Sequence, residues 1–163
     1  MNGQSDRRHR YTECGLDNVY LLNGFEPVET PRGVSVQIRD REGLHLAIGR
    51  HLVREKKELS GKEFRFLRHE LDMTQQLVAN LLQVDAQTVA RWEKGKAKQI
   101  PGPAQGMIRV LYEYKTGGDV EITRLLQELS ELDEIIHGDG EEAEPLDFED
   151  TEDGWQQTEG VAA

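Results

Sequence analysis

Three polar side chains with complementary hydrogen-bonding chemistry lie within one short stretch of the chain: Gln87, Thr88 and Arg91. Positions three and four apart project from the same face of a helix, so these side chains would point together. Their chemistry suits base edges in the major groove of DNA. Glutamine can bond adenine through two atoms, arginine can bond guanine through two atoms, and threonine can meet a thymine methyl group or a phosphate. The spacing therefore predicts a base-reading surface.

Two short helices are expected to position these side chains. Thr74 is a typical N-cap for a helix over 75–82, and Asp85 is one for a helix over 86–94, which Gly95 would end. A turn of about three residues forces the two helices to cross steeply, and Ala79 is small enough to allow it. The second helix would then present the N-terminal residues of its free face to the groove.

Contacts to DNA phosphates are expected on both sides of this face. Thr74 and Gln75 begin the first helix, where free N–H groups and the helix dipole attract an anion. Three basic residues follow the second helix, namely Lys94, Lys96 and Lys98. Each residue also has a plainer interpretation: Gln75 as a solvated helix start, Arg91 as a partner of a nearby carboxylate, and the lysines as solubilising charge.

The N-terminal third of the chain has a strand-like pattern. Val19 to Leu22 precedes Asn23-Gly24, a strong hairpin dipeptide, and two more strands over 25–30 and 34–38 flank Pro31-Arg32-Gly33. This pattern predicts a three-stranded β-meander. Helical spacing follows over 43–58 and 60–71, with Ser60 and Glu63 as a capping box. Pro101 and Pro103 break the chain before a closing helix through Met107 and Tyr112.

Charge divides the chain into two unlike parts. The formal net charge is −11. Residues 1–118 contain 19 Lys and Arg against 15 Asp and Glu, a net of +4, whereas residues 119–163 contain 1 against 16, a net of −15. A mildly basic body can approach phosphate, and the acidic C-terminal part cannot.

The acidic part contains two kinds of sequence. Apolar residues over 119–137 are spaced alternately by three and four, which predicts an amphipathic helix with a seam two heptads long. That helix could pack on its own domain, form a dimer or dock a partner protein. Residues 138–163 hold ten acidic residues and no Lys or Arg, so we expect a disordered tail. The tail could be merely solvated, compete with DNA phosphates, or bind a basic partner.

Several classes of function have no support in the sequence. The single cysteine, Cys14, excludes an internal disulfide and a cysteine-based zinc cage, and the five histidines lack metal-ligand spacing. There is no nucleophile elbow and no glycine-rich phosphate loop. We therefore expect no enzyme activity, cofactor or metal. With no apolar run of membrane length and no secretory signal, we expect a cytoplasmic, nucleoid-associated protein that does not bind a membrane.

The region 74–95 resembles the Cro/repressor (Xre) helix-turn-helix family. The resemblance rests on Thr74-Gln75-Gln76, Ala79, Val84, Thr88-Val89 and Arg91-Trp92-Glu93-Lys94-Gly95. It implies a DNA-binding helix-turn-helix. One position departs from the family: Gln83 stands where a glycine is usual, and a left-handed conformation there would cost glutamine about 1 kcal/mol or more.

A longer segment, roughly residues 11–115, resembles the MqsA-type antitoxin group. It rests on the stretches Tyr11–Val19, Glu42–His45, Phe64–Arg68 and Ile100–Ala104. Members of that group are typically dimeric DNA-binding antitoxins, many with an N-terminal zinc module of paired cysteines. This chain lacks those cysteine pairs, so neither zinc nor the toxin contacts of that module are carried over from the resemblance.

Taken together, these features predict a mainly α fold: a lambda-repressor-like helix-turn-helix bundle with a small N-terminal β-meander and a C-terminal acidic tail. The expected segments are a disordered N-terminus (1–10), the meander plus a helix (11–58), the DNA-binding domain (59–116), the amphipathic helix (119–137) and the tail (138–163). The expected function is a transcriptional repressor or autoregulator that binds double-stranded operator DNA as a homodimer. The alternative is an antitoxin that acts mainly by binding a toxin protein.

Overall fold

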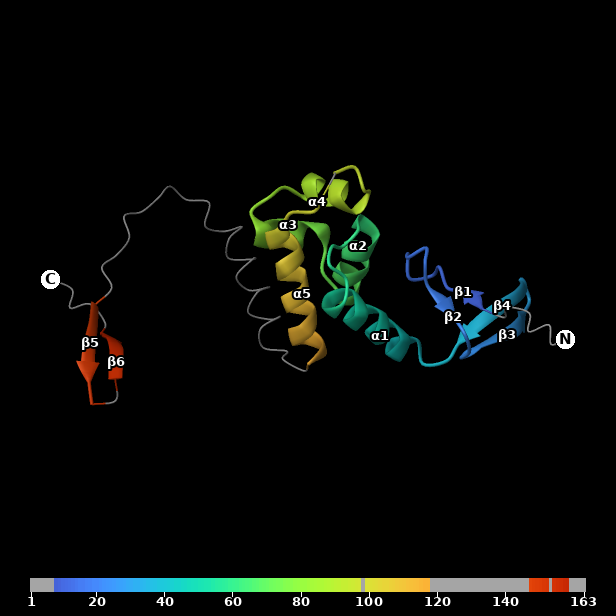
Figure 1. Cartoon of the computed structure of the whole chain (residues 1–163), viewed down its shortest axis with the longest axis horizontal. Helices are drawn as coiled ribbons and strands as arrows, with labels where there is room; N and C mark the ends of the chain where they lie inside the picture. The colour runs from blue at the N-terminus through green and yellow to red at the C-terminus, as the bar shows by residue number, and fades with distance from the viewer. Residues whose placement is uncertain (1–7, 98, 118–146, 153, 159–163) are drawn as a thin grey trace.

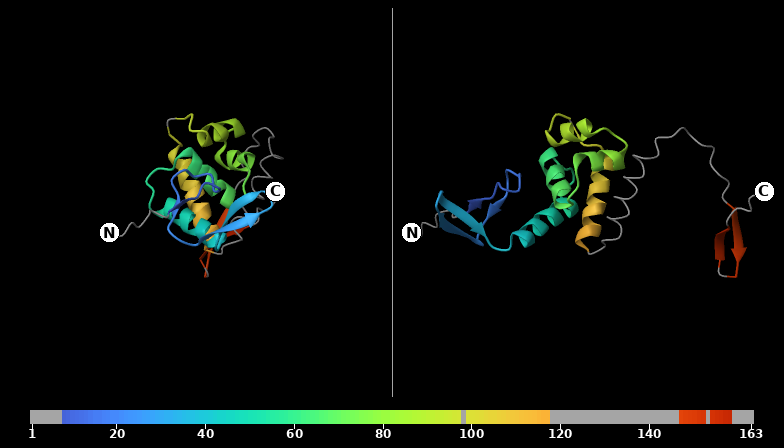
Figure 2. Two further views of the ribbon diagram at one scale, coloured as in Figure 1. Left: turned by 90° about the vertical axis from the view of Figure 1, so that its right-hand side faces the viewer. Right: turned by 180° about the vertical axis from the view of Figure 1, so that it is seen from behind.

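A computed structural model describes residues 8–97, 99–117, 147–152 and 154–158. Five helices form the body, which confirms the expected mainly α class (Figure 1). They are α1 (Arg41–Arg54), α2 (Gly61–Glu70), α3 (Gln75–Leu82), α4 (Ala86–Glu93) and α5 (Gly102–Thr116). In two opposite views, α1, α2 and α5 lie together, with α3 and α4 at one end of that group (Figure 2).

Local capping explains where three of these helices begin. At α2, the Ser60 hydroxyl accepts from the Glu63 N–H at 3.2 Å, and the Glu63 carboxylate accepts from the Ser60 N–H at 2.9 Å. This is the predicted capping box. Thr74 accepts from the N–H of Leu77 at 3.0 Å and so caps α3. The Asp85 carboxylate caps α4 in the same way.

The ends of the two outer helices differ from the expected ones. Helix α1 begins at Arg41 and ends at Arg54, not over 43–58, because the Asp40 carboxylate accepts from the Gly43 N–H at 3.1 Å and starts the helix earlier. Helix α5 already begins at Gly102, so Pro103 lies inside its first turn. Proline is tolerated there because the first N–H groups of a helix have no partner within the helix.

The apolar core lies among the five helices. Among the largest fully buried side chains are Phe64 and Leu67 of α2, Val78 of α3, Val89 of α4 and Ile108 of α5. Each helix of the body therefore contributes to one cluster, which fixes how the helices stack. None of the described helices is long and apolar enough to span a membrane.

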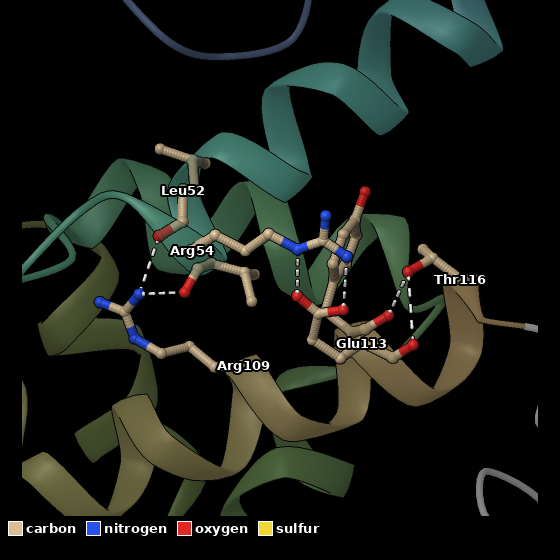
Figure 3. A network of polar contacts seen from close by, with 7 residues as sticks. Leu52, Arg54, Arg109, Glu113 and Thr116 are labelled. Atoms are coloured by element: carbon tan, nitrogen blue, oxygen red, sulfur yellow. Dashed lines mark hydrogen bonds and ion pairs between the residues drawn. The ribbon is translucent and has the colours of Figure 1, made fainter.

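Polar contacts from α5 hold the C-terminal end of α1 (Figure 3). One nitrogen of the Arg109 guanidinium donates to the carbonyls of Leu52 and Val53, each at 2.8 Å. These carbonyls belong to the last turn of α1, where carbonyl groups find no N–H donor farther along the helix. One turn farther along α5, Glu113 accepts two bonds from Arg54 at 2.7 and 3.0 Å. The Arg54 guanidinium holds the pKa of Glu113 below its usual range.

The predicted three-stranded meander is wrong. The chain forms two separate two-stranded sheets instead: β1 (His9–Arg10) pairs with β2 (Tyr20–Leu21), and β3 (Phe25–Thr30) pairs with β4 (Gly33–Ile38). Asn23-Gly24 therefore does not join two paired strands. Gly24 adopts a φ of 76°, and its carbonyl accepts from the Arg39 N–H at 2.8 Å, which closes the β3–β4 hairpin at its open end.

The same pairing corrects the expected N-terminal boundary. His9 and Arg10 were assigned to a disordered segment, yet they pair with Leu21 and Tyr20. The Tyr11 N–H continues this contact by donating to the Val19 carbonyl at 2.9 Å. The pairing partners lie about ten residues apart with no regular alternation between them, so a search for adjacent strands does not find them.

The β3–β4 hairpin has the expected second turn and one largely apolar face. Thr30 pairs with Gly33, which leaves Pro31 and Arg32 between the strands. Pairing also places on one face the side chains of Phe25, Pro27, Glu29, Val34, Val36 and Ile38. Val34 remains 74% exposed. The hairpin therefore keeps apolar surface that the described part of the chain leaves exposed.

Part of the segment expected to be disordered forms a third hairpin. Strand β5 (Asp147–Thr151) pairs with β6 (Gly154–Thr158), and Thr151 lies opposite Gly154. With Thr151 paired to Gly154, no strong hairpin dipeptide stands between the two strands, and the acidic composition predicted disorder instead. The amphipathic helix expected over 119–137 lies outside the described residues.

Packing of α1 on α5 leads to a first prediction. A Cβ atom at Gly49 would lie 2.0 Å from the Tyr112 hydroxyl oxygen and 2.2 Å from the ring carbon that bears it, and Tyr112 is buried. We expect Gly49→Ala to lower the free energy of unfolding by about 1–3 kcal/mol, because the ring cannot move aside without disturbing the core. Urea denaturation would measure the change.

Gly106→Ala is the matched control. Gly106 lies within α5, and a Cβ there would meet nothing within 4 Å. Alanine should raise the free energy of unfolding at this position by about 0.5–1 kcal/mol through its helix propensity. If both variants were equally stabilised, the close contact between Gly49 and Tyr112 would not exist in solution.

Candidate nucleic-acid interface

The turn between α3 and α4 is left-handed despite the absence of glycine. Gln83 adopts φ 57° and ψ 41°. In this conformation the N–H groups of Gln83 and Val84 donate back to the carbonyls of Asn80 and Ala79, at 3.2 and 3.0 Å. These bonds end α3 and turn the chain at once into the N-cap of α4. Glutamine therefore takes the backbone geometry for which glycine is best suited.

One face of each short helix is anchored in the core. Val78 and Ala79 of α3 and Val89 of α4 have no exposed surface, and Ala79 is the small residue that the steep crossing requires. The Trp92 ring meets the Phe64 ring edge-on with centroids 6.0 Å apart. Trp92 is 7% exposed, so it belongs to the core rather than to the surface.

A buried ion pair joins α2 to the end of α4. The Arg68 guanidinium donates to both oxygens of the Glu93 carboxylate, at 2.5 and 3.1 Å. The side chains are 8% and 3% exposed. Arg68 also donates to the Met73 carbonyl at 2.9 Å, and the Gln75 amide donates to Glu93 at 2.6 Å. The pair thus connects α2, the chain before α3, the first turn of α3 and the end of α4.

Close backbone contact holds the same two helices together. A Cβ atom at Gly61 would lie 2.2 Å from the Trp92 carbonyl oxygen and 2.7 Å from that of Glu93. Only glycine lets the first turn of α2 approach the last turn of α4 so closely. The position of α4 is therefore fixed at its C-terminal end by both backbone contact and charge.

The free face of α4 carries two of the three predicted base-reading residues. Gln87 and Arg91 are exposed and lie four residues apart. Arg91 takes part in none of the ion pairs formed by residues that the structure describes. The predicted alternative, a salt bridge that occupies its guanidinium, is thus not seen. Both side chains can reach outward from a rigid helix.

The third residue, Thr88, is half-buried and its hydroxyl is already engaged. It donates to the Asp85 carboxylate at 2.8 Å, and the Thr88 N–H donates to the same oxygen at 2.7 Å. Bonds from the Thr88 backbone and side chain lower the pKa of Asp85, so this N-cap stays ionised at neutral pH. Thr88 therefore offers its methyl group and a lone pair, not a donor, to a ligand.

The predicted phosphate-binding residues fall into two groups. Thr74 is exposed, Gln75 is half-buried, and both lie at the start of α3, where Gln75 donates one side-chain N–H to Glu93. For an anion Gln75 retains the second N–H of its side-chain amide and its backbone N–H in the first turn. Lys94 and Lys96 are exposed at the other end of α4, and Lys98 lies outside the described residues.

Sequence reasoning missed the residues that hold this surface in place, although a signal for them existed. Glu93 lies four residues after the core position Val89, and Arg68 lies four residues after Phe64. Both charges thus fall on buried helix faces. A charged residue at a core position almost always has a partner of opposite charge. Two such positions on neighbouring helices indicate a buried pair.

Among the residues placed in the structure, no group of three or more His, Cys, Asp and Glu is arranged to hold a metal ion. Comparison of the chain with protein-family models, with curated proteins and with solved structures returns no match. The function must therefore be argued from the geometry of α3 and α4.

The buried pair gives a second prediction. Glu93→Gln should lower the free energy of unfolding by about 3 kcal/mol, because it leaves the Arg68 charge buried without a counter-charge. In contrast, the double variant Arg68→Met/Glu93→Leu removes both charges and should recover more than half of that loss. Thermal and urea unfolding would measure both. A double variant no more stable than Glu93→Gln would show that the pair is not desolvated in solution.

The left-handed turn gives a third prediction. Gln83→Gly should raise the free energy of unfolding by about 0.5–1 kcal/mol, because glycine adopts positive φ without steric cost. The β-branched variant Gln83→Val should instead lower it by more than 1 kcal/mol, about the cost of this conformation for such a residue. Equal stability of the glycine and valine variants, compared by chemical denaturation, would rule out a left-handed residue at this turn.

Proposed function

We propose that the chain is a sequence-specific DNA-binding regulator in which α2 to α5 form a helix-turn-helix bundle and α4 is the recognition helix. The observation that carries the proposal is the two-sided character of α4. One side is locked by Val89, Trp92 and Glu93, while Gln87 and Arg91 stand exposed on the free side. A rigid, exposed helix with amide and guanidinium groups has the chemistry for reading base edges in a major groove.

Local charge supports this proposal even though the whole chain is acidic. Residues 73–99 contain two carboxylates, Asp85 and Glu93. Asp85 caps α4, and Glu93 is buried against Arg68. The same stretch carries four basic residues, Arg91, Lys94, Lys96 and Lys98. The surface around α4 is therefore positive where DNA would approach.

Phosphate groups would be held on both sides of α4. Thr74 and the N–H groups that begin α3 would bind one backbone segment, and Lys94 and Lys96 would bind another. Gln87 and Arg91 would then read bases, with the Thr88 methyl group available for a thymine. In this arrangement the phosphate contacts set the register and the two exposed polar side chains set the sequence.

Operator binding by a homodimer follows from the small size of the reading surface. Helix α4 has eight residues and presents few groups to bases, so one copy can specify only a few base pairs. Two copies related by a two-fold axis would read half-sites about 34 Å apart. Such a dimer, acting in the cytoplasm on the nucleoid, would repress transcription by occupying a promoter, its own included.

A fourth prediction separates the two kinds of DNA contact. Arg91→Ala should reduce the ratio of specific to non-specific affinity about tenfold or more, because it removes a base contact worth about 1–3 kcal/mol. Lys96→Ala should weaken binding equally on all sequences and reduce the salt slope by about 1, because it removes one phosphate contact. Fluorescence anisotropy at several salt concentrations would measure both, on the chain's own upstream DNA and on random duplex.

Arg50→Ala is the matched control, since Arg50 is an exposed residue of α1, which lies away from α4 (Figure 1). It should change neither specificity nor salt slope. If Arg91→Ala and Lys96→Ala gave the same changes on both DNAs, the assignment of roles would be wrong. If the full chain bound no DNA, including duplexes offered in a random-sequence selection, the regulator proposal would fail. Capture of a toxin protein would then be the function to pursue.

A further inference from the structure

A cleft of about 550 Å³ lies beside the proposed DNA surface. Its walls come from three parts of the chain that are distant in sequence: the loop Glu13–Gly15, His45 of α1 with the exposed side of α2, and the end of α4 at Glu93 and Lys94. The volume falls within the range of pockets that hold small molecules. None of the proposed base-reading residues lines it.

The carboxylates in this cleft already have cationic or imidazole partners. Glu13 pairs with Arg41 at 3.0 Å, Glu70 with His45 at 2.7 Å, and Glu93 with the buried Arg68. Arg41 and Arg68 lie outside the set of residues that line the cleft. Each of these wall carboxylates therefore already has a hydrogen-bonded or ion-paired partner within the protein.

Two of the three basic side chains that line the cleft form no ion pair with a described residue. Lys62 pairs with Asp17, whereas Arg65 and Lys94 remain able to bind an anion. Within the part of the chain that the structure describes, neither has a carboxylate within 4 Å. Arg65 makes one long contact, from its Nε to the Nε2 of His69 at 3.4 Å. Burial and the charges of Arg68 and Arg65 lower the pKa of His69, so it accepts this bond as a neutral ring at pH 7.

The base of the cleft is aromatic. Phe66 is 3% exposed, and its ring lies 5.6 Å from that of His45, centroid to centroid. Both nitrogens of His45 are used, one by the Tyr11 hydroxyl at 2.8 Å and the other by Glu70. His45 therefore contributes a ring face held in place by two hydrogen bonds. An ion pair formed over such a base is screened less than one on an open surface.

We propose that this cleft binds a small anionic ligand, with a phosphate-type oxyanion held between Arg65 and Lys94. A guanidinium from α2 and an ammonium from the end of α4, both lining the cleft, can share one such group through charge-assisted bonds. The concave shape, with the 13–15 loop on one side, suits a small molecule better than the convex backbone of a DNA duplex. The site does not depend on the proposed DNA-binding function, and Lys94 gives it a route to influence that function.

The test uses the full chain, labelled with ¹⁵N, and inorganic pyrophosphate as the probe in buffer of matched chloride strength. Pyrophosphate should shift the amide signals of Gly15, Arg65 and Lys94 saturably. Arg65→Gln and Lys94→Gln should each weaken binding about tenfold, the loss of one charge-assisted hydrogen bond. Arg50→Gln removes the same charge outside the cleft and should leave the affinity unchanged. Both cleft residues are exposed, so the variants should fold.

Two results would overturn the proposal. One is the absence of saturable shifts, or equal affinity in the wild-type chain and both cleft variants. The other is that pyrophosphate fails to bind while Arg65→Gln weakens binding to random duplex as Lys96→Ala does, which would make the cleft an extension of the phosphate-contacting surface. The pyrophosphate titration contains no DNA, so its outcome stands apart from that of the DNA-binding experiment.

Discussion

The buried pair between Arg68 and Glu93 is the interaction on which the arrangement of the short helices depends. It is the point where α2, the chain before α3, the first turn of α3 and the end of α4 all meet through hydrogen bonds. Burying two charges is costly, and apolar residues of the same volume often stabilise a fold at least as well. The pair instead fixes how α4 is oriented relative to α2, because a bidentate contact restricts the angle between two helices more narrowly than apolar packing does. The exposed face of α4 is aimed by this contact.

Local interactions were predictable from sequence because their partners are a few residues apart. The capping box of Ser60 and Glu63 and the N-caps Thr74 and Asp85 each depend on a span of three residues, and each occurs as predicted. Contacts between distant residues were not predictable in this way. The partner of β2 is β1, the segment before it, rather than β3. A prediction that pairs neighbouring strands across a turn signal follows Asn23-Gly24, and it cannot take into account that Leu21 becomes buried in the fold.

The candidate site shows the same division. Helical spacing placed Gln87 and Arg91 together, and the structure leaves both exposed on one helix. Spacing could not show that the Thr88 hydroxyl and one side-chain N–H of Gln75 already donate within the protein, because those bonds depend on Glu93, 18 residues away from Gln75, and on the rotamer of Thr88. Residue type and spacing therefore identify every side chain that could contact a ligand, including some whose donors are already used. The structure shows which of these side chains still have a free hydrogen-bonding group.

That reduction has a consequence for specificity. In the proposed complex, Gln75 acts on DNA through the helix that it stabilises, and the donors left for base edges come from Gln87 and Arg91. Two side chains on one helix distinguish few base pairs, and each well-formed bidentate contact is worth only about 1–3 kcal/mol. The proposed homodimer would add selectivity through a second, identical surface at a fixed distance, since contributions from well-separated positions are roughly additive. Because Arg68 and Glu93 hold α4 rigidly, the distance between the two α4 helices of such a dimer would stay constant.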